Sequence, residues 1–175
     1  NEIRSLFVDS RGALWIGFAG SGVVVRRGDE FVAVEPSALT ALGFAEDADG
    51  LLLGTDKGLF HWRHDTPLLF EPVAWAAALA DRLVVQVTVD RLARAWLNVQ
   101  AQGIFCLESG QLRGPLSFGD QPFGEAYFVT ALLDERRDPV FSTPGGFFTA
   151  GEQGVRPAGR QQVDSTDPQY VQLVD

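Results

Sequence analysis

The sequence predicts an all-β protein, a β-propeller segment of about four four-stranded antiparallel blades. The first observation is a repeat in which a strand-like run ends on an acidic residue: Asp9, Asp47, Asp90, Glu135 and Asp175. The spacings are 38, 43, 45 and 40 residues, a period typical of propeller arrays. The second is a content of 19 Gly and 9 Pro, which suits short strands joined by tight turns. The third is that only residues 74–82 favour a helix.

Each repeat unit has the same order of elements. An apolar strand leads into an acidic turn, then a strand centred on a large residue, a Gly-marked turn, another apolar strand and a weaker fourth strand. The predicted blades are about 3–38, 39–82, 83–126 and 127–162, with 163–175 as the start of a further blade. Their first strands are expected near Ile3, Ala41, Val84 and Phe128, followed by a lone strand at 170–174. Both ends fall at the same phase of the repeat, so we expect a piece of a longer propeller.

The acidic residues that end the first strands are interpreted as structural turn residues. An Asp at a turn start accepts hydrogen bonds from backbone N–H groups two or three residues on. Repeat symmetry places Asp9, Asp47, Asp90 and Glu135 in separate blades, so they are not expected to converge on a metal ion. Gly12 and Gly50 are expected to supply the positive φ that the turn needs.

Large residues recur at one place after the acidic turn. Trp15, Trp96 and Phe141 follow their acids by six residues, and Leu52 follows by five because one residue is deleted in the second unit. Blade-to-blade packing would select such bulk, whereas Leu52 would be a poor platform for stacking a ligand. We therefore predict that all four are buried at corresponding places between blades.

The first two units carry a more specific pattern. The matching residues of the first are Asp9, Gly12, Leu14, Trp15, Ile16, Gly17 and Gly22, and those of the second are Asp47, Asp49, Gly50, Gly54, Thr55, Gly58 and Leu59. This pattern resembles the two-component regulator propeller repeat, whose consensus runs roughly D-x-x-G-x-x-W-I-G-T-x-x-G-G-L. The third and fourth units lack the turn glycine. The sialidase-type Asp-box also pairs an Asp turn with a Trp, but Phe7 stands where it has Ser or Thr.

The resemblance implies a function. Propellers of this repeat type are commonly the periplasmic sensing part of membrane-anchored regulators, ahead of a histidine kinase or a diguanylate cyclase. We therefore expect a non-catalytic, periplasmic ligand-sensing segment without a cofactor, whose ligand is a glycan fragment or another small molecule. One alternative is a protein-interaction or assembly propeller, completed by remaining blades or a second copy of the chain. The other is a propeller lyase.

Two tryptophans are left as ligand-binding candidates. Trp62 and Trp75 do not recur at equivalent positions, and Trp75 belongs to an irregular insert. His61 and His64 flank Trp62, but no third histidine exists, so no metal site is predicted there. The single cysteine, Cys106, lies in an alternating strand and is interpreted as a buried structural thiol.

Charge argues against a nucleic-acid partner. The formal net charge is −9, which would repel a phosphate backbone. The basic pairs Arg26-Arg27 and Arg136-Arg137 are too short to reverse this balance locally. No apolar stretch reaches the length that a membrane-spanning helix needs, so contact with a membrane is expected only through a parent protein.

Overall fold

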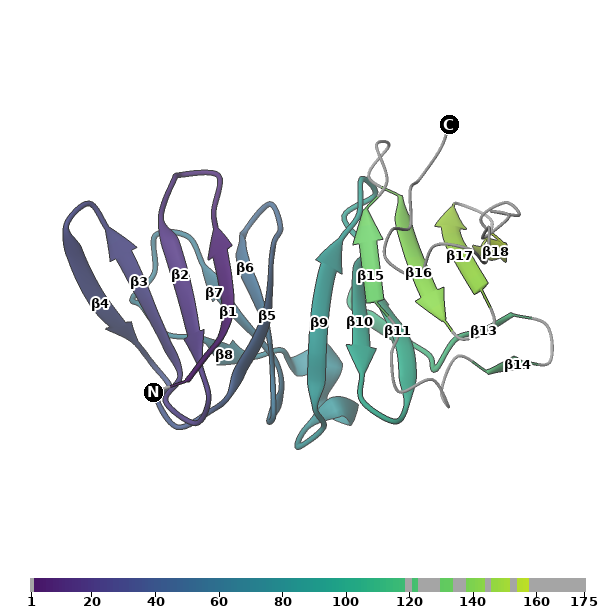
Figure 1. Ribbon diagram of the computed structural model, residues 1–175, viewed down its shortest axis with the longest axis horizontal. Coiled ribbons are helices and arrows are strands. Elements are labelled where there is room, and N and C mark those ends of the chain that lie inside the picture. The colour runs from purple at the N-terminus through teal and green to yellow at the C-terminus, as the bar shows by residue number, and fades with distance from the viewer. Residues whose placement is uncertain are drawn as a thin grey trace, which may run out of the picture.

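The computed structural model describes residues 2–118, 121–122, 130–133, 138–143, 146–151 and 154–157. Its strands form four four-stranded sheets and one two-stranded sheet, and in each the consecutive strands pair antiparallel (Figure 1). The predicted fold class, an all-β propeller segment, is confirmed. The predicted strand starts at Ile3, Ala41 and Val84 are confirmed too. Phe128, the lone strand at 170–174 and the Arg136-Arg137 pair lie outside the described residues.

We call the four-stranded sheets blades 1 to 4. Blade 1 contains β1 (Ile3–Val8), β2 (Leu14–Phe18), β3 (Val23–Arg27) and β4 (Glu30–Val34). Blade 2 contains β5 (Ala41–Glu46), β6 (Gly50–Thr55), β7 (Gly58–Arg63) and β8 (Glu71–Pro72). Blade 3 contains β9 (Val84–Val89), β10 (Ala95–Val99), β11 (Gly103–Glu108) and β12 (Gln111–Arg113). Blade 4 contains β15 (Thr130–Leu133), β16 (Pro139–Thr143), β17 (Gly146–Gly151) and β18 (Gly154–Pro157), and the small hairpin of β13 (Ser117–Phe118) and β14 (Gln121–Pro122) precedes it.

The blades follow one another in chain order. The first strand of each blade packs against the first strand of the next: β1 against β5, β5 against β9, and β9 against β15. A short 3-10 helix, η1 (Ala74–Leu79), connects blades 2 and 3, inside the run predicted to favour a helix. Among the described residues, no helix is long and apolar enough to cross a membrane.

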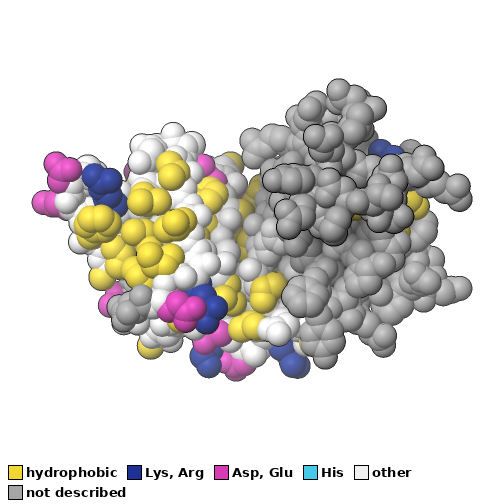
Figure 2. All heavy atoms as spheres, viewed as in Figure 1, with side chains coloured by type: hydrophobic (Ala, Val, Ile, Leu, Met, Phe, Trp, Pro, Cys, Tyr) yellow, Lys and Arg dark blue, Asp and Glu magenta, His cyan; other side chains and the backbone are white. Residues whose placement is uncertain are grey.

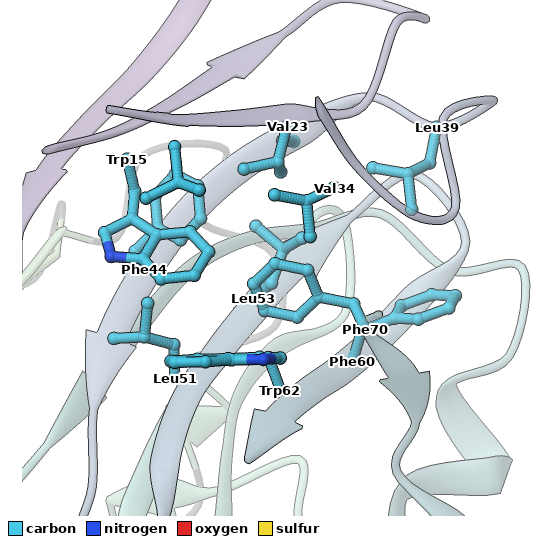
Figure 3. Close-up of a cluster of buried hydrophobic side chains, with 12 residues drawn as sticks. Trp15, Val23, Val34, Leu39, Phe44, Leu51, Leu53, Phe60, Trp62 and Phe70 are labelled. Carbon is cyan, nitrogen blue, oxygen red and sulfur yellow. The ribbon is translucent and has the colours of Figure 1, made fainter. Parts of the chain in front are cut away.

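Apolar side chains fill the junctions between consecutive blades. Because side chains alternate along a strand, each blade sends one set toward the preceding blade and one toward the following blade. In the junction between blades 1 and 2, Trp15 and Val23 of blade 1 pack in one cluster with Leu51, Leu53 and other residues of blade 2 (Figure 3). Separate apolar clusters occupy the junctions between blades 2 and 3 and between blades 3 and 4.

The acidic turns are built around their carboxylates. Asp9 Oδ1 accepts hydrogen bonds from the backbone N–H groups of Arg11 and Ala13, and Oδ2 accepts one from Trp15 Nε1 at 2.8 Å. Asp90 repeats this pattern with residues 92, 94 and 96. The turns therefore close over two and four residues, one residue wider than predicted. The Trp of these two blades is also a hydrogen-bond donor, a role that selection for bulk alone does not explain. The Glu135 turn lies outside the described residues.

The shorter turn of blade 2 corrects the prediction for Gly50. Gly12 has the predicted positive φ of 80°, but Gly50 is not among the positive-φ residues. The Asp47 N–H bonds to the Gly50 carbonyl as the Asp9 N–H bonds to that of Ala13, so the deleted residue is the one equivalent to Gly12. Gly50 is needed for another reason: a Cβ there would clash with the backbone of Trp62 and would lie 2.9 Å from the Cα of Arg63.

The four bulky residues are all buried, as predicted, but Phe141 occupies a different strand position. The pair Leu133–Pro139 closes the β15–β16 ladder as Val8–Leu14 closes the ladder of β1 and β2. Phe141 is therefore equivalent to Ile16, not to Trp15. A slip of one residue turns a side chain to the other face of the sheet, and accordingly Phe141 points back toward blade 3, where its ring lies 5.3 Å from that of Trp96.

Blade 1 has an exposed apolar face. Phe7 packs into the junction with blade 2, so its neighbours Leu6 and Val8 point to the opposite side of the sheet, where each is 62% exposed. Ile3 and Phe31 are exposed as well. Figure 2 shows hydrophobic side chains gathered over the β1–β4 sheet.

Candidate ligand-binding cleft

A cleft of about 590 Å³ opens at the junction between blades 2 and 3. Blade 2 contributes Asp47, Leu52 and His61, the β11–β12 region of blade 3 contributes Leu107, and Trp75 of η1 lies at the same cleft. We call this hollow the 2/3 cleft. A smaller one of about 390 Å³, the 1/2 cleft, occupies the equivalent place between blades 1 and 2 and contains Asp9, the counterpart of Asp47.

Two Trp-to-Leu replacements explain why the 2/3 cleft is roomier. At the junction between blades 1 and 2, the rings of Trp15 and Trp62 pack with their centroids 4.9 Å apart and occupy part of the space between the sheets (Figure 3). Leu52 is the counterpart of Trp15. Leu107 is the counterpart of Trp62. Each lies on the third strand of its blade and pairs with the second-strand residue that faces the last residue of the first strand. Two smaller side chains at the same two positions leave a hollow.

Trp75 is held beside this hollow by blade 3. Its side chain is 63% exposed, and Gly110 of the β11–β12 turn lies against the fused edge of its indole, with room for a Cβ only at 3.4 Å from Cδ2 and Cε2. An exposed indole that packs against the backbone of a turn offers a flat apolar surface to a ligand. Trp75, a predicted ligand-binding candidate, therefore lies at a cleft.

Trp62, the other candidate, lies buried in the junction between blades 1 and 2, where it borders the 1/2 cleft. It is 3% exposed, it packs on Trp15, and its Nε1 donates a hydrogen bond to the Pro67 carbonyl. The guanidinium of Arg27 lies 5.8 Å from its ring. Its partner comes from another blade, so spacing along the chain could not reveal this packing.

Asp47 and His61 form the polar wall of the 2/3 cleft. Asp47 Oδ1 accepts hydrogen bonds from the N–H groups of Asp49 and Gly50, and His61 Nε2 lies 3.3 Å away. An ionised carboxylate can only accept, so this contact requires a proton on Nε2. Burial by itself raises the pKa of Asp47, but the His61 hydrogen bond and charge and the two amides outweigh it and lower the pKa. His61 thus supplies the donor that Trp15 supplies to Asp9.

The two histidines and the cysteine singled out in the sequence lie in different surroundings. His64 packs edge-on against Trp62 at 5.3 Å, whereas His61 faces the 2/3 cleft. Cys106 is buried, and this burial raises the pKa of its thiol to about 11, so the thiol is protonated at neutral pH. Within the described ranges, no group of three or more His, Cys, Asp or Glu side chains is arranged to hold a metal ion.

Sequence comparisons do not identify the chain further, since neither a protein-family model nor a curated protein matches it. Solved structures do match. The extracellular domain assigned to the hybrid two-component system BT3049 of B. thetaiotaomicron aligns with a TM-score of 0.71 at 15% identity, over 89% of this chain and 23% of that one. PorZ, a surface component of the type-IX secretion system of Porphyromonas gingivalis, aligns with a TM-score of 0.63 at 15% identity, over 85% and 25%.

A third match is a protein solved with a bound peptide. YCF48, solved with a bound D1 peptide, aligns with a TM-score of 0.60 at 12% identity, over 88% of this chain and 52% of that one. This chain spans about a quarter of the length of the two matches above. At these identities the likeness defines the fold: a propeller-type domain like those of extracellular two-component-system domains.

Proposed function

We propose that the chain is a non-catalytic ligand-sensing propeller segment of a membrane-anchored signalling regulator, working in the periplasm. The 2/3 cleft carries this proposal, because it is about 590 Å³ in volume, whereas the equivalent cleft between blades 1 and 2, beside two packed tryptophans, is about 390 Å³. The likeness to extracellular domains of signalling systems supports the setting. The ligand is a small molecule, such as a glycan fragment, and no cofactor takes part.

The cleft suits recognition of a small ligand. Small-molecule sites combine apolar walls with a few well-placed polar groups. Leu52, Leu107 and Trp75 supply apolar surface here, while Asp47 and His61 supply hydrogen-bonding groups. Because the walls belong to two blades, a bound ligand would bridge them and favour one arrangement of the blades over others.

Filling the cleft should abolish ligand binding. Leu107→Trp introduces a tryptophan at the position equivalent to Trp62 and places an indole in the 2/3 cleft. A library of mono- and oligosaccharides and other small metabolites is screened by thermal shift. A ligand that binds only the folded protein stabilises it by about 2.7 kcal/mol at 100 times its Kd, so the cleft ligand raises the Tm of the natural chain and leaves that of Leu107→Trp unchanged.

Leu69→Trp is the matched control, since Leu69 is exposed and does not line the cleft. This variant should keep the ligand-induced shift. Ligands that stabilise all three proteins equally would place binding elsewhere, and a screen without any stabilising ligand would count against the sensing function. Saccharide turnover, followed by mass spectrometry in the same samples, would replace the non-catalytic proposal with the lyase alternative.

The exposed face of blade 1 favours a second candidate, an assembly function. Leu6, Val8 and Phe31 lie on it, and such faces mark interaction sites. If assembly occurs through this face, sedimentation should show complexes that Leu6→Lys dissociates. Leu92→Lys, an exposed leucine of blade 3, should leave them intact. A natural chain that sediments as a monomer at every concentration would contradict self-assembly.

A further inference from the structure

The charges around the 2/3 cleft do not balance. Three carboxylates line it, those of Asp47, Asp49 and Glu71, against a single guanidinium, that of Arg63. Arg63 Nη1 lies 3.4 Å from Glu71 Oε2, so these two charges offset each other. Asp47 has the His61 imidazole as its partner at 3.3 Å. Among the described residues, the Asp49 carboxylate has neither a hydrogen-bond nor an ion-pair partner, because only its backbone takes part in the turn. The cleft therefore keeps an excess of negative charge.

The 1/2 cleft shows that this charge is specific to one junction. Arg11 and Asp49 each stand two residues after the turn aspartate of their blade. Arg27 is the counterpart of Arg63 by the strand register of the two blades. Arg11 lies 3.7 Å from Asp65, whose counterpart in the 2/3 cleft is Gly110. The same place in the repeat thus holds a cation at one junction and an anion at the next.

Trp75, the aromatic side chain at the 2/3 cleft, also favours a positively charged ligand. The face of an indole attracts a cation through the quadrupole of the ring, and the attraction grows as the cation loses water. Trp75 is exposed and supported by Gly110. Carboxylates together with an exposed indole complement a ligand that has both a positive charge and apolar surface.

We propose that the 2/3 cleft recognises a ligand that carries an ammonium group, with Asp49 and Trp75 as the residues that select it. This inference rests on the proposed function and names the ligand class for the same cleft. Ligands of this class include amino sugars and small organic amines. A neutral ligand of the same shape would leave the Asp49 charge without a counterpart, and an acidic one would be repelled by it.

The test compares probes of similar shape that carry a positive, no or a negative charge. Glucosamine, glucose and glucuronate share a pyranose ring, and choline has 3,3-dimethylbutanol as its neutral analogue. Each is titrated into the full chain at low ionic strength, with binding followed by NMR chemical-shift changes of the indole N–H groups. We expect the cationic probes to bind about tenfold more tightly than their neutral counterparts, with the largest shift at Trp75 and the weakest binding by glucuronate.

Two variants test whether the preference for cationic probes depends on the 2/3 cleft. Asp49→Asn removes the charge and should abolish the tenfold preference while retaining weak binding of the neutral probes. Asp65→Asn removes an exposed carboxylate beside the 1/2 cleft and should change nothing. Raised salt should weaken the cationic probes selectively, because it screens exposed charges.

Several results would overturn the inference. Equal binding of charged and neutral probes, with every one lost in Leu107→Trp, would leave the cleft as a ligand site and refute the ammonium preference. Tightest binding by glucuronate, or no effect of either cationic probe on Trp75, would refute it as well. The screen against Leu107→Trp decides the sensing function separately, so the two failures are distinguishable.

Discussion

Asp90→Ala is expected to lower the free energy of unfolding by about 3–5 kcal/mol, the usual cost of removing one partner of a buried ion pair. The Asp90 carboxylate accepts hydrogen bonds from the N–H groups of Leu92 and Arg94, from Arg94 Nε at 2.7 Å and from Trp96 Nε1 at 2.9 Å. The side chains of Asp90 and Arg94 are 0% and 8% exposed, so water cannot replace the lost contacts. Urea unfolding followed by circular dichroism measures the change.

Asp9→Ala is the matched control for Asp90→Ala. Its turn has the same backbone and Trp hydrogen bonds, but Ala13 stands where blade 3 has Arg94. Without a buried cation, the loss should be about 1–3 kcal/mol. Equal losses in the two variants would show that the Arg94 contact adds nothing to stability.

The pH dependence of stability gives a further check on Asp90. Burial raises the pKa of this carboxyl, but the hydrogen bonds from Trp96, Arg94 and Leu92 outweigh it and hold the pKa below its ordinary value of 3.8. A depressed folded-state pKa contributes stability above the unfolded-state value, and this contribution is lost as the pH falls toward the folded-state value. The difference between the natural chain and Asp90→Ala should therefore be constant near neutral pH and shrink below about pH 4.

Trp15→Ala should also destabilise the chain by about 3–5 kcal/mol, the cost of truncating a large core aromatic. Trp15 is fully buried, its ring centroid lies 4.9 Å from that of Trp62 and 5.9 Å from that of Phe70, and its Nε1 bonds to Asp9. The truncation removes packing between two blades and leaves a buried acceptor without its donor. Urea unfolding gives the magnitude.

Trp15→Leu separates the effect of volume from that of the hydrogen bond. Leu is the residue that blade 2 uses at this position, and there His61 lies beside the turn Asp. In blade 1 the residue paired with position 15 is Val25, which has no side-chain donor. We expect Trp15→Leu to be more stable than Trp15→Ala but less stable than the natural chain. A Trp15→Leu variant as stable as the natural chain would refute a role for the indole N–H.

The architecture could be predicted because the repeat period is long, regular and tied to strand starts. Ile3, Ala41 and Val84 open their blades where the pattern places them. The register within a unit was harder. In the fourth unit Asp134 and Glu135 are adjacent, so either residue could end the first strand of the blade. Taking Glu135 as the end of the strand predicts that Phe141 lies on the opposite face of its strand from the one it occupies.

The site was only partly predictable. Trp75 stood out because it lies in an insert and has no counterpart in the other units. The cleft itself exists because Leu52 and Leu107 are smaller than the tryptophans at the equivalent positions. These positions can be recognised as equivalent only when the register of the second and third strands is known for each blade. The burial of Trp62 could not be predicted because its packing partner belongs to a different blade.

The paired positions Trp15 with Trp62 and Leu52 with Leu107 have an evolutionary consequence. The junction between blades 1 and 2 and the junction between blades 2 and 3 differ at two codons whose side chains point between sheets, so the main-chain ladders are untouched. A duplicated blade that keeps this pair of positions would therefore keep the means to change the space at its junction. Recombination could move a cavity from one junction to another as a unit, without redesign of the surrounding scaffold.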